Sequence, residues 1–116
     1  MDFPRSGASL AVLAPAPVSV LYGITAVRLE GRQVVEVMMG MIDPSLEYWD
    51  LRPAPTRVVE VVDRLVEGDT VVTLFPTERG TLRMGPEVMV DVLPQGAETL
   101  ALAEDDGRHI TDLPRF

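Results

Sequence analysis

The chain has 116 residues, with 10 basic and 18 acidic side chains, and its net charge at pH 7 is −8. This length fits one domain, and 47% hydrophobic with 24% charged residues is typical of a folded globular protein. The absence of Cys excludes disulfide scaffolds and thiol chemistry, and the single His excludes sites that need several imidazoles. The acidic charge opposes binding to nucleic acids and anionic membranes, so we expect neither as a partner.

Residues 1–17 mix Pro, Ser, Ala and Gly without hydrophobic periodicity, which predicts a flexible tail before a single domain over residues 18–116. The apolar stretch of this tail is broken by Pro15 and Pro17, so we expect no secretion signal and a cytoplasmic location. No run approaches the roughly 20 apolar residues that a membrane-spanning helix needs. All ten basic residues are Arg, as codon bias in a GC-rich genome produces, and we expect a small bacterial domain.

A β-hairpin is predicted over residues 20–42. Both arms are rich in β-branched residues, and Gly31-Arg32 supplies the turn between them. The second arm is apolar on both faces, which is usual for a strand inside a sheet or one covered on its second face by a helix or partner. One face carries Val35, Val37, Met39 and Met41, and the other carries Val34, Met38 and Ile42.

Residues 43–56 are predicted to form a long loop, because Asp, Pro, Ser and Thr interrupt this stretch repeatedly. It holds the only Trp, and Trp and Tyr bury large areas at binding sites while Arg is enriched beside them. The alternative is structural: Trp49 folds back over the sheet and Tyr48 points outward. The candidate binding residues are Glu47, Tyr48, Trp49, Asp50 and Arg52.

One amphipathic helix is predicted from about Pro55 to Glu67, because the apolar residues recur with a period of 3.6 and occupy a single arc. Pro55 suits the first turn, Thr56 is the expected N-cap, and Gly68 fits the position after the last turn. A helix with one apolar face must pack on a sheet.

The rest of the chain predicts short strands separated by turns, including a turn at Gly85-Pro86. The expected fold is therefore α+β: a mainly antiparallel sheet or half-barrel of about six or seven strands, in the order ββαβββββ, with the helix packed on it. The expected strands cover residues 69–75, 81–84, 87–93, 98–104 and 108–113.

A second candidate site consists of Asp105, Asp106 and His109. Carboxylates beside an imidazole are suited to a ligand site or to general-base chemistry. However, Asp-Asp-Gly also makes a tight turn, and no second imidazole or marked nucleophile accompanies His109. We therefore expect no bound metal and no cofactor.

Two hypotheses for function follow from these features. The first is a small, acidic, non-catalytic domain that binds a protein partner or a second copy of itself. The alternative is a small-ligand-binding domain or enzyme that uses His109 with nearby carboxylates. The scarcity of catalytic residue types favours the first hypothesis.

Overall fold

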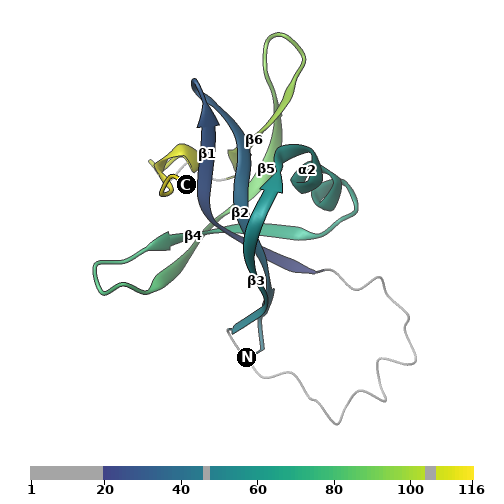
Figure 1. The fold of residues 1–116 in the computed structure, drawn as a ribbon. Helices are drawn as coiled ribbons and strands as arrows, with labels where there is room; N and C mark the ends of the chain where they lie inside the picture. Colours follow the sequence, from purple (N-terminus) through teal and green to yellow (C-terminus); the bar gives the residue numbers. More distant parts are fainter. Residues whose placement is uncertain (1–19, 46–47, 104–106) are drawn as a thin grey trace, which may run out of the picture.

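The computed structural model describes residues 20–45, 48–103 and 107–116, which form an α+β fold with a six-stranded mixed sheet and one α-helix (Figure 1). The strands lie side by side in the order β3-β2-β1-β4-β5-β6. The elements are β1 (Leu21–Glu30), β2 (Gln33–Asp43), β3 (Tyr48–Arg57), α2 (Val58–Val66), β4 (Thr70–Pro76), β5 (Leu82–Val92), β6 (Glu98–Leu102) and the 3-10 helix η1 (Ile110–Asp112).

The predicted hairpin is confirmed by the pairing of β1 and β2. Glu30 and Gln33 are partners on either side of the two-residue turn, and Gly31 has a φ of +63°, which glycine adopts without steric cost. β2 lies between β1 and β3, so the strand with two apolar faces is indeed an interior strand.

The prediction of a loop over residues 43–56 is wrong, because most of this stretch forms β3. Its prolines, which argued against a strand, are tolerated because β3 is the edge strand and one side of it pairs with no described strand. β3 extends to Arg57, so α2 begins at Val58 and not at Pro55. Arg57 occupies the N-cap position, whereas Thr56 pairs with Val37 in the sheet.

The sheet is mixed rather than mainly antiparallel, because α2 acts as a crossover. β3 is antiparallel to β2, which is antiparallel to β1, so β3 and β1 run in the same direction. The helix returns the chain to the end of the sheet where β3 began. β4 therefore pairs with β1 in parallel, from Leu21↔Thr70 to Ile24↔Thr73.

β5 is one continuous strand, where the sequence predicted two short strands separated by a turn at Gly85-Pro86. Val72 pairs with Glu87 and Leu74 pairs with Met84, so two steps along β4 correspond to three along β5. The extra residue makes a β-bulge at Gly85-Pro86. Beyond it β5 changes partner from β4 to β6, and the β4–β5 and β5–β6 hairpins extend in different directions (Figure 1).

The end of the chain also departs from prediction. Residues 108–113 contain η1 instead of a strand, so the observed order is βββαβββ and not ββαβββββ. The following residues lie against β1: the Val27 amide donates to the Pro114 carbonyl at 2.8 Å, and the Phe116 amide donates to the Val27 carbonyl at 3.2 Å. The Arg28 guanidinium lies 4.8 Å from the centre of the Phe116 ring.

The hydrophobic core lies between α2 and one face of the curled sheet. The curl brings β6 against β2 even though β1, β4 and β5 separate them in the strand order, and α2 contacts both. The buried core side chains are Ile24, Val27, Val34, Val37, Met39, Val61, Val62, Val71, Val88, Leu100, Ile110 and Leu113.

The predicted tail, residues 1–17, lies outside the described residues. Within the described part of the chain, no helix is long and apolar enough to cross a membrane.

Candidate functional site

Two neighbouring glycines, which have no side chains, leave a depression in the sheet face opposite the helix. Gly23 of β1 and Gly40 of β2 are direct partners, and a Cβ at Gly40 would lie 2.8 Å from Cε3 of Trp49. A Cβ at Gly23 would lie 2.7 Å from the Cδ1 atoms of Ile42 and Leu74. The two glycines therefore allow large apolar side chains to lie directly on the backbone of the sheet.

These side chains form the base of a groove of about 540 Å³. Leu74 is only 8% exposed and belongs to the floor, whereas Leu82 and Met84 are 45% and 54% exposed and Tyr48 is 65% exposed. Large apolar side chains that stay exposed together mark interaction sites or ligand-binding grooves. The described residues that line this apolar groove are all uncharged: Ile42, Pro44, Tyr48, Trp49, Leu74, Leu82 and Met84.

The bulge in β5 brings Met84 to the groove. Side chains alternate between faces along a regular strand. Without a bulge, Met84 would therefore lie on the same face of the sheet as the buried core residue Val88, four positions further on. The extra residue at Gly85-Pro86 reverses this alternation, and Met84 becomes the cross-strand partner of Leu74. The Thr73 hydroxyl donates to the Pro86 carbonyl at 2.9 Å and is fully buried, which holds the bulge in place.

The structure separates the residues predicted for the Trp-containing segment. Tyr48 and Trp49 line the apolar groove. Asp50 and Arg52 are exposed on β3 and do not line it, and Glu47 lies outside the described residues. Trp49 is partly buried, because its ring covers Gly40 while it also borders the groove.

Sequence reasoning missed the opposite side of the groove, formed by Leu74 of β4 and by Leu82 and Met84 of β5. The available signal was the presence of Gly23 and Gly40 inside predicted strands, since an interior glycine often marks a close approach to the backbone.

The methionines of β2 and β5 lie in different environments. Met39 is buried in the core and Met38 is partly buried, whereas Met84 and Met89 are exposed on β5. Only Met84 of these four lines the groove.

His109 lies at the start of η1 and is exposed. Its backbone amide donates to Oδ2 of Asp112 at 2.8 Å. With Arg108 it lines a separate hollow of about 350 Å³, and the Arg108 guanidinium lies 4.4 Å from the centre of the Phe75 ring. Asp105 and Asp106 lie outside the described residues, and among those described no group of three His, Asp or Glu residues is placed to hold a metal.

No family model, curated protein or solved structure matches the chain.

Proposed function

We propose that this protein is a small non-catalytic domain that binds a segment of another protein in the apolar groove. One observation carries the proposal. Tyr48 and Trp49 line one side of the groove, Leu82 and Met84 line the other, and Leu74 forms part of the floor between them. Aromatic anchors beside a desolvated apolar pocket are the usual centres of binding energy in protein interfaces.

The chemistry of the groove favours a protein segment over a small polar ligand. Ligand pockets combine an apolar lining with several placed polar groups, and among the described lining residues only the Tyr48 hydroxyl and the Trp49 ring N–H are polar side-chain groups. An inserted apolar side chain needs no such polar groups.

The charge of the chain favours a different protein over a second copy. Each copy carries a net charge of −8, so self-association brings like charges together, whereas a neutral or basic partner does not meet this repulsion.

Site-specific photo-crosslinking in the source organism tests the proposal. A benzophenone amino acid replaces Leu82 in the groove, and the matched control replaces Val66, which is 77% exposed on α2. We expect a discrete adduct with one other protein at position 82 and none at position 66. Adducts with a second copy only, equal adducts at both positions, or no adduct at position 82 would each contradict the proposal.

Binding of the purified partner then measures the contribution of the groove. Trp49 is the only Trp and borders the groove, so its fluorescence reports occupancy. We expect Met84→Ser to weaken binding by roughly tenfold, a moderate hot-spot effect. Met89→Ser is the control, since Met89 is exposed on the same strand but does not line the groove. Equal effects of the two changes would count against the groove.

The alternative, a ligand-binding domain or enzyme that uses His109 with Asp105 and Asp106, has one supporting observation: Arg108 and His109 border the same hollow. A metabolite screen that follows the His109 ring resonances tests it. Saturable shifts that His109→Gln abolishes would favour this alternative, and their absence would remove it.

A further inference from the structure

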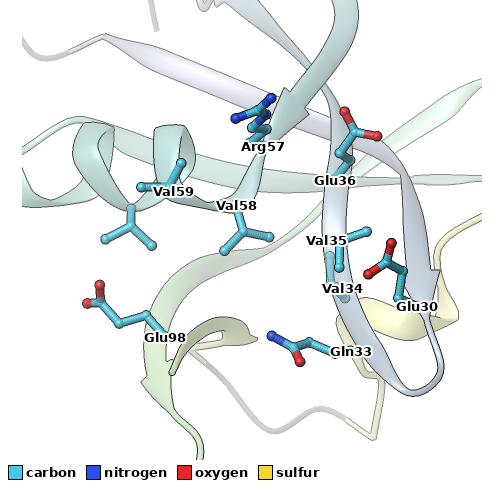
Figure 2. A pocket seen from close by; sticks show the side chains of 10 residues that line it. Glu30, Gln33, Val34, Val35, Glu36, Arg57, Val58, Val59 and Glu98 are labelled. Carbon is cyan, nitrogen blue, oxygen red and sulfur yellow. The ribbon is translucent and has the colours of Figure 1, made fainter. Parts of the chain in front are cut away.

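A second hollow, of about 630 Å³, lies on another part of the surface and shares no lining residue with the apolar groove (Figure 2). It lies where the β1–β2 turn, the start of α2 and the start of β6 meet. Its base is aliphatic and its rim is charged. The aliphatic residues are Val34, Val35, Val58, Val59 and Val62, and the polar ones are Glu30, Gln33, Glu36, Arg57 and Glu98.

The rim has an excess of negative charge, with three glutamates against one arginine. Glu36 is compensated, because its Oε1 lies 3.5 Å from Nε of Arg28 and its cross-strand partner is Arg57. Glu30 and Glu98 form no ion pair within the described residues. These two carboxylates lie on opposite sides of the hollow with valines between them (Figure 2). The hollow is therefore suited to a cationic side chain that also has an apolar stem.

Two strand edges border the same hollow. The ladder between β2 and β3 begins at Glu36↔Arg57, so residues 33–35 of β2 have no described strand on that side. β6 is the last strand of the sheet, and its edge away from β5 is likewise without a described strand. Exposed strand edges accept extended peptides through backbone hydrogen bonds, with alternate side chains supplying specificity.

We infer that this acidic hollow, lined by the ten residues named above, binds an extended basic segment of a protein. The segment adds as a strand beside residues 33–35 of β2, places aliphatic stems on the valines, and pairs its cationic groups with Glu30 and Glu98. This inference stands apart from the proposed function, because a different surface and a different partner chemistry carry it.

An NMR titration of the 15N-labelled full chain tests the inference. The probe is a blocked eight-residue peptide of alternating Lys and Val, and the control peptide has Glu in place of Lys. We expect saturable amide shifts centred on residues 33–36 and 98–100 with the Lys peptide and none with the Glu peptide. Shifts elsewhere only, or spread evenly over all acidic surfaces, would overturn the inference.

A comparison of two double variants separates specific binding from general charge attraction. The double variant Glu30→Gln/Glu98→Gln should weaken peptide binding by about three- to tenfold, as expected for two exposed ion pairs. Glu78→Gln/Glu87→Gln makes the same change of charge on β4–β5 and should leave binding nearly unchanged. An equal loss in both double variants would refute the assigned rim.

The backbone contribution is tested with the same Lys–Val peptide N-methylated at alternate residues. This peptide keeps its charge but loses the donors that strand addition uses. We expect its binding to be lost, and undiminished binding would overturn strand addition.

Discussion

Both faces of the sheet carry apolar side chains, but one face is covered by the helix and the other is partly exposed. On the helix face, Ile24 and Val37 of the sheet and Val61 of α2 are fully buried in one core cluster. On the opposite face, near Gly23 and Gly40, no described element covers the apolar side chains, and they shield one another only in part. Composition does not distinguish the faces, whereas the presence of a covering element does. The covered face supplies the hydrophobic core, and the open face leaves part of its apolar surface exposed.

Val61→Asp should be the most damaging change to the covered face. It puts a carboxylate at a position that is 0% exposed, and we expect a loss of about 4 kcal/mol or more in the free energy of unfolding. Val59→Asp is the matched control, because Val59 lies on the same helix and is 59% exposed. Chemical denaturation followed by circular dichroism measures both. A cooperatively folded Val61→Asp with wild-type stability would disprove this packing.

Leu74→Ala tests whether the floor of the groove also supports the fold. Leu74 is 8% exposed, so its truncation leaves a cavity and should cost about 2–4 kcal/mol. Met84→Ala, its cross-strand partner at 54% exposed, should cost less than about 1 kcal/mol. Thermal and denaturant unfolding of both variants compares them. Equal losses would contradict the prediction that Leu74 supports the fold more than Met84 does.

Gly40→Ala tests the close approach that shapes the groove. The added methyl would lie 2.5 Å from the Leu51 carbonyl oxygen and 2.8 Å from the Pro53 nitrogen, and these backbone atoms cannot move without displacing β3. We expect a loss of about 1–3 kcal/mol and a changed Trp49 emission spectrum. Gly23→Ala should be milder, because its methyl meets the side-chain ends of Ile42 and Leu74. A stable Gly40→Ala with unchanged emission would contradict this geometry.

Thr73→Val should have the smallest effect of the four main changes. It keeps the shape of the buried side chain but removes the donor to the Pro86 carbonyl, for an expected loss of about 1–2 kcal/mol. Thr73→Ser keeps the hydroxyl and serves as the control for the bond itself. Unfolding free energies of the two variants, with amide shifts of residues 84–87, give the measurement. An unperturbed bulge in Thr73→Val would show that this hydrogen bond does not hold it.

Local pattern predicted the elements that local physics dominates. The Gly31-Arg32 hairpin depends on neighbouring residues and a turn that tolerates positive φ, and the helix depends on an arc of valines and leucines with a 3.6-residue period. The two apolar faces of β2 likewise predicted its interior position. For the candidate site, the sequence pointed to Tyr48 and Trp49, because Trp and Tyr side chains bury large areas at binding sites.

Tertiary structure alone decided the rest. The local sequence around Pro53 and Pro55 predicts a loop, and only the edge position of β3 makes these prolines compatible with a strand. The Gly85-Pro86 dipeptide predicts a turn. Only the pairing of β5 with β4 makes this dipeptide a bulge, which brings Met84 opposite Leu74. The parallel pairing of β4 with β1 depends on where the helix returns the chain. Each feature is a contact between distant segments, and a groove built from β2, β3, β4 and β5 exists only once those contacts form.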